Sequence, residues 1–135
     1  MSAEAGGKPR VLFVCVGNSC RSQMAEAFAR AAGLEAASAG TEPSQGVSSK
    51  AVAVMAEVGH DLATHTPKML EWDALASYDR VITMGCGVAE SCPSLRTDED
   101  WGLEDPVDQE LDVVRAVRDD IERRVTDLVA RLRTA

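Results

Sequence analysis

The chain has 135 residues, 45% of them hydrophobic, which is enough for one ordinary domain with its own core. Fourteen Lys and Arg against 22 Asp and Glu give a formal net charge of −8, which argues against nucleic acid or an anionic membrane as the partner. No apolar run approaches the roughly 18 residues that a membrane span requires, and residues 1–9 lack the apolar segment of a signal peptide. We therefore expect a cytoplasmic protein in which residues 1–9 form a flexible tail and residues 10–135 a single domain.

Strand-like and helix-like segments alternate along the chain. Residues 11–14 are a short apolar run typical of a buried parallel strand, and residues 23–32 have apolar side chains at helical spacing. A weak strand at residues 34–38, helices at 51–58 and 68–75, a strand at 80–84 and a short edge strand near Trp101 follow. The last segment is the clearest helix, with apolar residues at steps of three and four: Leu111, Val114, Val117, Ile121, Val125, Leu128 and Leu132. The alternation predicts an α/β domain whose parallel sheet is covered on both faces and takes its ligand at the carboxyl end of the strands.

A loop that begins with a cysteine and ends with an arginine joins the first strand to the first helix. A strand, a tight loop and a helix N-terminus form an arrangement that binds oxyanions, because backbone N–H groups converge there. Cys15 would be a thiolate at the floor of this cradle, and Arg21 would supply a two-pronged donor for a tetrahedral anion. The backbone of the residues between them would bind the substrate: Val16, Gly17, Asn18, Ser19 and Cys20. The loop predicts a nucleophile aimed at a phosphate-like anion.

The cysteine content favours redox or catalytic roles. Four cysteines without an export signal indicate a reducing compartment, in which disulfide staples are uncommon. Cys86 and Cys92 lie in a long segment of the second half of the chain, with five residues between them. No Cys or His with ligand spacing lies near them, so no metal site is expected. We interpret the Cys20 thiol as a bystander.

The loop from Cys15 to Ser22 resembles that of the low-molecular-weight protein tyrosine phosphatases, and the longer string to Glu26 is similar to the arsenate reductases of the same fold. Those phosphatases usually have proline after Arg-Ser, where this chain has Gln23. Further matches span residues 10–132: Ser38-Ala39-Gly40, His65-Thr66, the region of Cys86 and Cys92-Pro93, Trp101-Gly102 and Asp105-Pro106. The resemblance implies a three-layer αβα sandwich with a four-stranded parallel sheet.

The resemblance also implies roles for Cys15, Arg21, Ser22 and Asp105 in the reaction. The Cys15 thiolate would attack arsenic, and Arg21 with the loop N–H groups would stabilise the oxyanion. Ser22 would donate a hydrogen bond that keeps the thiolate ionised. Asp105 would supply the proton for the leaving oxygen.

Reduction needs two electrons, which Cys86 and Cys92 would supply as the second and third thiols of a relay. In thioredoxin-coupled reductases six residues separate the corresponding pair, so alignment on Cys92 puts Gly85 at the position of the second thiol. Two readings stay open. Either the segment is one residue shorter and a three-cysteine relay works with thioredoxin, or a low-molecular-weight thiol such as mycothiol or glutathione acts with a mycoredoxin or glutaredoxin. In both, the protein needs no cofactor, and we expect a monomer.

Some relatives bind potassium beside the loop through an Asn, a Glu, a Ser and an Asp. Asn18, Glu26 and Ser38 match the first three, but Lys68 stands at the fourth position. We therefore expect that the Lys68 ammonium takes the place of the ion and that the protein does not depend on potassium.

Two other functions compete with arsenate reduction. One is a low-molecular-weight phosphatase that hydrolyses aryl phosphates through a Cys15 phosphoenzyme. Gln23, the distal cysteine pair and an aromatic content of 4% argue against it. The other is a module without turnover that binds an anion, or chelates arsenite through Cys86 and Cys92.

Overall fold

The structure, a computed structural model, describes residues 8–85, 94–104, 106 and 108–134. Four strands form one sheet: β1 (Arg10–Cys15), β2 (Glu35–Gly40), β3 (Arg80–Thr83) and β4 (Glu99–Asp100). Their order is β2-β1-β3-β4, and every neighbouring pair is parallel. In register, Cys15 pairs with Gly40, Val14 with Thr83, and Thr83 with Asp100, so the carboxyl ends of the strands meet at one edge. The predicted four-stranded parallel sheet is confirmed.

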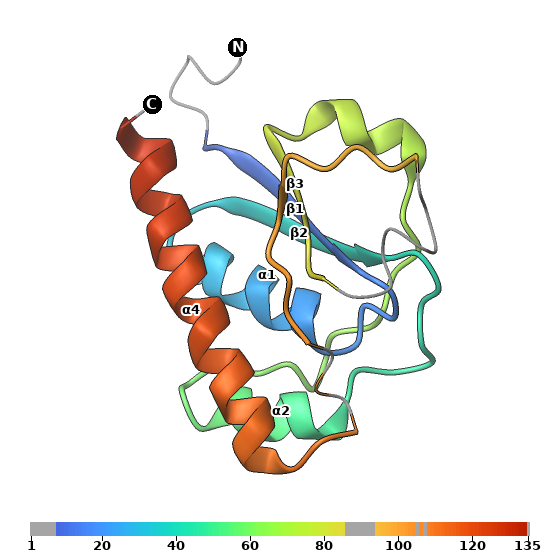
Figure 1. The fold of residues 1–135 in the computed structure, drawn as a ribbon, viewed down its shortest axis with the longest axis vertical. Helices are drawn as coiled ribbons and strands as arrows, with labels where there is room; N and C mark the ends of the chain where they lie inside the picture. The colour runs from blue at the N-terminus through green and yellow to red at the C-terminus, as the bar shows by residue number, and fades with distance from the viewer. Residues whose placement is uncertain (1–7, 86–93, 105, 107, 135) are drawn as a thin grey trace.

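The helices lie on both sides of this sheet. They are α1 (Arg21–Ala31), α2 (Ser49–Ala56), the 3-10 helix η1 (Trp72–Ser77) and α4 (Leu111–Thr134). Figure 1 shows α1, α2 and α4 gathered on one side of the sheet and η1 at the opposite side. Of the described residues, no helix is long and apolar enough to cross a membrane.

Alternating side chains of β1 build two apolar cores. Val11, Phe13 and Cys15 face α1, α2 and α4, whose buried side chains include Ile121 and Leu128. Leu12 and Val14 face the other way, into a smaller cluster that η1 and its neighbouring segments close: Ala39, Leu70, Leu75, Val81 and Leu95. Because successive side chains of a strand point to opposite faces, an entirely apolar strand is expected to be covered on both.

The expected helix at residues 68–75 is wrong in its first half. Gly40 N donates to the carbonyl of Lys68 and Leu70 N to the carbonyl of Gly40, which makes a bridge between Gly40 and Met69. These long-range bonds occupy backbone groups that a helix would need, so only the 3-10 turn Trp72–Ser77 follows.

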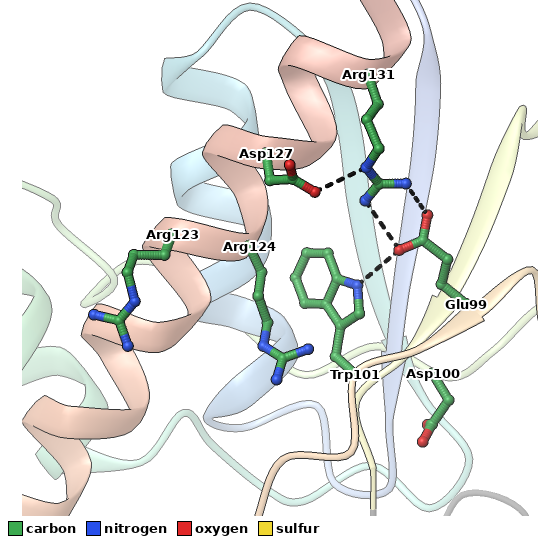
Figure 2. A pocket seen from close by; sticks show the side chains of 7 residues that line it. All are labelled: Glu99, Asp100, Trp101, Arg123, Arg124, Asp127 and Arg131. Carbon is green, nitrogen blue, oxygen red and sulfur yellow. Dashed lines mark hydrogen bonds and ion pairs between the residues drawn. The ribbon is translucent and has the colours of Figure 1, made fainter.

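Charged side chains join the short strand β4 to α4. Glu99 accepts hydrogen bonds from the Arg131 guanidinium and from the Trp101 indole, while Asp127 accepts from Arg131 as well (Figure 2). Trp101 is almost fully buried, and its ring centroid lies 5.5 Å from that of Phe13 in β1. A depression of about 600 Å³ lies between β4 and α4, and four of the residues that line it, Glu99, Trp101, Asp127 and Arg131, pair with one another, which suits a structural role.

Another ion-pair cluster joins α2 to α4. Arg115 Nη2 and Arg118 Nη1 each lie 2.8 Å from a carboxylate oxygen of Glu57, the residue that follows α2. Hydrogen bonds from Arg115 and then Arg118 lower the pKa of Glu57 from 4.5 to about 2. A carboxyl group whose pKa is lower in the folded state stabilises the fold above its unfolded pKa, and this contribution disappears as the pH falls through the folded value.

We predict that Glu57→Gln lowers the free energy of unfolding at pH 7, and that its difference from wild type shrinks as the pH falls from about 4.5 to about 2. Urea unfolding at pH 7, 5 and 3 under reducing conditions measures this difference. Glu122→Gln, a change at an exposed glutamate of α4, is the matched control. A difference that stays constant over this pH range would show that the ion pairs do not produce it.

Candidate active site

The predicted loop occupies the turn between β1 and α1. Cys15 is the last residue of β1 and Arg21 is the first of α1, so residues 16–20 form the connection at the carboxyl edge of the sheet. Asn18 has a φ of 50°, in the left-handed region that asparagine tolerates better than most residues. Cys15 is 2% exposed and lies at the floor of the turn.

The carbonyl groups of this loop all point away from its centre. Amides of the segment after β2 bind four of them: Thr41 N, Glu42 N, Ser44 N and Ser48 N donate to the carbonyls of Cys15, Val16, Gly17 and Ser19. The carbonyl of Asn18 accepts from Gln23 Nε2 at 3.2 Å. In a trans peptide the N–H points opposite to the C=O, so the N–H groups of residues 16–20 are directed inward. This is the anion-binding concavity that the sequence predicts.

Two donors converge on the Cys15 sulfur. Asn18 N donates to Sγ at 3.2 Å, and Ser22 Oγ lies 2.8 Å from Sγ. Asn18 Nδ2 donates to Ser22 Oγ at 2.8 Å, so the serine oxygen already accepts one hydrogen bond and its own hydrogen is available to the sulfur. The arrangement suits a thiolate, which accepts hydrogen bonds but cannot donate one.

A further layer of hydrogen bonds fixes Asn18. Its Oδ1 accepts from the backbone N–H of Lys68 at 2.8 Å and from Gln23 Nε2 at 3.2 Å. Gln23 Oε1 in turn lies 3.0 Å from His65 Nδ1. Gln23 is completely buried, so the residue that stands where related phosphatases have proline serves here to orient the asparagine.

Arg21 connects the loop to two other segments. The guanidinium is almost fully buried, and Nη1 donates to the carbonyl of Met84 at 2.8 Å and to that of Leu103 at 3.0 Å. Met84 directly follows β3, and Leu103 lies just beyond β4. The sequence suggested an anion ligand; the structure adds a contact that joins the ends of three strands.

The loop encloses a cavity of about 220 Å³. Its lining consists of Cys15, Val16, Gly17, Ser19, Cys20, Arg21, Glu42 and Ser44. This volume lies below the range of about 300–1,000 Å³ that is usual for drug-sized ligands. The cavity therefore suits a small tetrahedral anion.

Sequence reasoning missed the wall that residues 41–48 build. Glu42 and Ser44 line the cavity, and the segment binds the loop through main-chain amides. A backbone donor leaves no residue-type signature in the sequence. The wall could have been inferred from the parallel pairing of β1 with β2, in which Cys15 lies beside Gly40. In such a sheet the segment that follows the neighbouring strand passes the site.

Three predicted site residues, Cys86, Cys92 and Asp105, lie outside the described residues. Their chain neighbours Gly85, Leu103 and Pro106 are described, and Pro106 is buried. Among the residues that the structure describes, no group of three or more His, Cys, Asp or Glu could bind a metal ion.

A buried cysteine at the floor of an N–H nest, with an arginine at the start of the following helix, defines a class of enzymes that attack tetrahedral oxyanions with a thiolate. Residues 10–135 match the family described as low molecular weight phosphotyrosine protein phosphatase, and the chain belongs to this family.

Several proteins that are similar to this chain are arsenate reductases. The glutaredoxin arsenate reductase of Synechocystis sp. is 44% identical over 91% of this chain and 98% of its own length. The arsenate reductase of Staphylococcus aureus is 36% identical over 92% of this chain and 98% of its own. A solved structure of an arsenate reductase in the phosphate binding state is 42% identical, with a TM-score of 0.78 over 91% of this chain and 98% of that one.

We predict that Ser22→Ala lowers the rate of Cys15 alkylation by iodoacetamide at pH 7, because the variant lacks the hydroxyl beside the sulfur. A hydrogen bond to a charged group contributes about 1.5–3 kcal/mol, so we expect the rate to fall about tenfold or more. Mass spectrometry of the Cys15 peptide follows the reaction. Ser48→Ala, which removes the N-cap hydroxyl of α2, is the control and leaves the rate unchanged. Equal rates in Ser22→Ala and wild type would exclude Ser22 as a donor to the thiolate.

Proposed function

We propose that this protein is an arsenate reductase in which Cys15 is the nucleophile. The observation that carries the proposal is the Cys15 sulfur, 2.8 Å from Ser22 Oγ at the floor of a small cavity toward which the N–H groups of residues 16–20 are directed. Relatives that are 36–44% identical over nearly the whole chain are arsenate reductases, which supports the same activity here.

The first step forms a sulfur–arsenic bond. The Cys15 thiolate attacks dihydrogen arsenate, one oxygen leaves as water after it takes up a proton, and an S–As(V) adduct remains. Arg21 and the loop N–H groups bind the oxygens that carry the charge. Asp105 is the proposed proton donor, supported by its position two residues after Leu103, whose carbonyl Arg21 contacts.

The second step transfers the electrons. A second thiolate, which we assign to Cys86, attacks the Cys15 sulfur, and the S–As bond breaks with its electron pair left on arsenic. Arsenic is reduced from As(V) to As(III), arsenite leaves after protonation, and a Cys15–Cys86 disulfide remains.

The third step restores the enzyme. Cys92 attacks the disulfide at Cys86, Cys15 is released as a thiolate, and an external dithiol reduces the Cys86–Cys92 disulfide. We propose thioredoxin as this dithiol, with a glutaredoxin or mycoredoxin system as the alternative. The alternative draws support from the Synechocystis relative, which is a glutaredoxin arsenate reductase.

Hydrolysis of aryl phosphates through a Cys15 phosphoenzyme remains the competing activity, since the family includes phosphatases. None of the described residues that line the cavity is aromatic, and residues 86–93, 105 and 107 contain no aromatic side chain either. A phosphotyrosine ring would therefore find few stacking partners around the cavity. This favours a small inorganic anion as the substrate.

We predict arsenate-dependent oxidation of NADPH when the protein is mixed with thioredoxin and thioredoxin reductase. Cys15→Ser abolishes it, and Cys86→Ser and Cys92→Ser each reduce it at least about a hundredfold, because each removes one electron-transfer step. Cys20→Ser is the matched control and retains activity. Full activity of Cys86→Ser with thioredoxin would contradict the relay. Activity only with a glutaredoxin or mycoredoxin system would establish the alternative reductant.

We also propose that Lys68 replaces a bound potassium ion. Glu26, 3% exposed, accepts from Ser38 Oγ at 2.5 Å, and its two oxygens lie 3.7 Å from Lys68 Nζ and 3.2 Å from Arg30 Nη2. A hydroxyl and two cationic side chains thus surround the carboxylate that would have to bind the ion. These residues do not fit a potassium site.

We predict that potassium chloride and sodium chloride have the same effect on the melting temperature and on arsenate reduction. Lys68→Asp removes the ammonium and adds a carboxylate, so this variant gains a specific response to potassium. Lys50→Asp, a change at a lysine that donates to the carbonyl of Gln109, is the control. A specific stabilisation of the wild-type protein by potassium would contradict the proposal.

A further inference from the structure

The backbone just before Cys86 is fixed from several sides by described residues. Arg21 Nη1 donates to the carbonyl of Met84 at 2.8 Å and to that of Leu103 at 3.0 Å. One guanidinium therefore joins the nucleophile loop to the residue after β3 and to the segment after β4. Met84 is completely buried. The position of residue 84 relative to Cys15 is thereby set by a buried, charge-assisted pair of hydrogen bonds.

Gly85, the residue after Met84, is restricted by its backbone conformation and by its contacts. Its φ is 101°, and a Cβ at this residue would collide with the backbone oxygen and nitrogen of Leu103. A side chain at position 85 is excluded by both the backbone conformation and the contact. The second thiol of the proposed relay therefore has to be carried by another residue, and Cys86 is the next in the sequence.

Asp100 provides the remaining contact. Its Oδ1 accepts from Thr83 Oγ1 at 2.6 Å and from Gly85 N at 3.2 Å. Figure 2 shows Asp100 pointing away from Arg131 and Trp101, while Glu99 points toward Arg131, as expected for neighbouring residues of a strand. The carboxylate thus binds the last residue of β3 and the residue before Cys86, and takes no part in attaching β4 to α4.

We propose that Asp100 is a positioning residue for the second thiol of the relay. Cys86 is bonded in sequence to Gly85, whose backbone is held by Asp100 and packed against Leu103, next to Met84, which Arg21 binds. An attachment point that is already ordered lowers the entropy cost of bringing a thiol at the next residue to the Cys15 adduct, so it favours the proposed attack. The inference rests on the proposed function, because it assigns to Cys86 the second step of arsenate reduction.

The test compares two steps in single-turnover experiments on the full chain, without external reductant. Alkylation of Cys15 by iodoacetamide reports on the nucleophile loop. Arsenate-dependent formation of a disulfide that contains Cys86, whether to Cys15 or after transfer to Cys92, is measured by mass spectrometry and reports on the second step. We expect Asp100→Ala to slow disulfide formation at least about tenfold while Cys15 alkylation stays within about twofold of wild type. Asp100→Asn retains an oxygen that can accept from Gly85 N and restores most of the rate.

Asp98→Ala is the matched control. Asp98 Oδ2 accepts from Val81 N at 2.8 Å, so this variant also removes a carboxylate that binds β3, but at a position away from Gly85. It should leave both rates unchanged. Equal disulfide rates in Asp100→Ala and Asp98→Ala, or an equal loss of both rates in Asp100→Ala, would overturn the positioning role. Absence of an arsenate-dependent disulfide in the wild-type protein would instead overturn the proposed function, and the positioning role with it.

Discussion

The outward direction of the carbonyl groups in residues 15–19 is the constraint on which the rest of the site depends. Amides of residues 41–48 and the side chain of Gln23 bind these carbonyls, and the trans geometry of each peptide then turns the N–H groups toward the cavity. Without those donors the carbonyl groups would need other hydrogen-bond partners, and the peptides would not be held with their N–H groups toward the cavity. The side chain of Asn18 adds a second fixed donor through Ser22. The chain therefore builds an anion site inside a protein whose formal net charge is −8.

The same loop serves hydrolysis and reduction, so the distinction between these reactions has to lie elsewhere. A phosphatase transfers its adduct to water, whereas a reductase needs a second thiol within reach of the nucleophile. The contacts of Arg21 bring together the loop, the end of β3 and the segment after β4, from which Cys86 and Asp105 follow in the sequence. A thiol placed at this junction would let the oxyanion site that phosphatases also have carry out a reduction. The small cavity and its lining, which includes no aromatic residue among those described, agree with an inorganic substrate.

Much of the fold could be predicted from the sequence, because burial imposes a local pattern. The apolar run at residues 11–14 lies within β1, and the three- and four-residue spacing from Leu111 to Leu132 lies within α4. The expectation failed at residues 68–70, where the backbone pairs with Gly40 across a distance in sequence that no local pattern records. The thiolate loop was predictable from residue type, whereas the amides of residues 41–48 were not. The hydrogen bond from Gly85 N to the Asp100 carboxylate likewise joins residues far apart in sequence, and no local pattern indicates it.

In the proposed reaction, Cys15 and a second thiol together supply the two electrons that arsenate accepts. The most direct test mixes the reduced protein with arsenate, without any external reductant, and counts arsenite and free thiols after one turnover. We expect one arsenite released and two thiols lost per chain, with a disulfide that joins Cys86 to Cys92 after Cys92 has displaced Cys15. Binding or slow hydrolysis with an unchanged thiol count and no arsenite would contradict it.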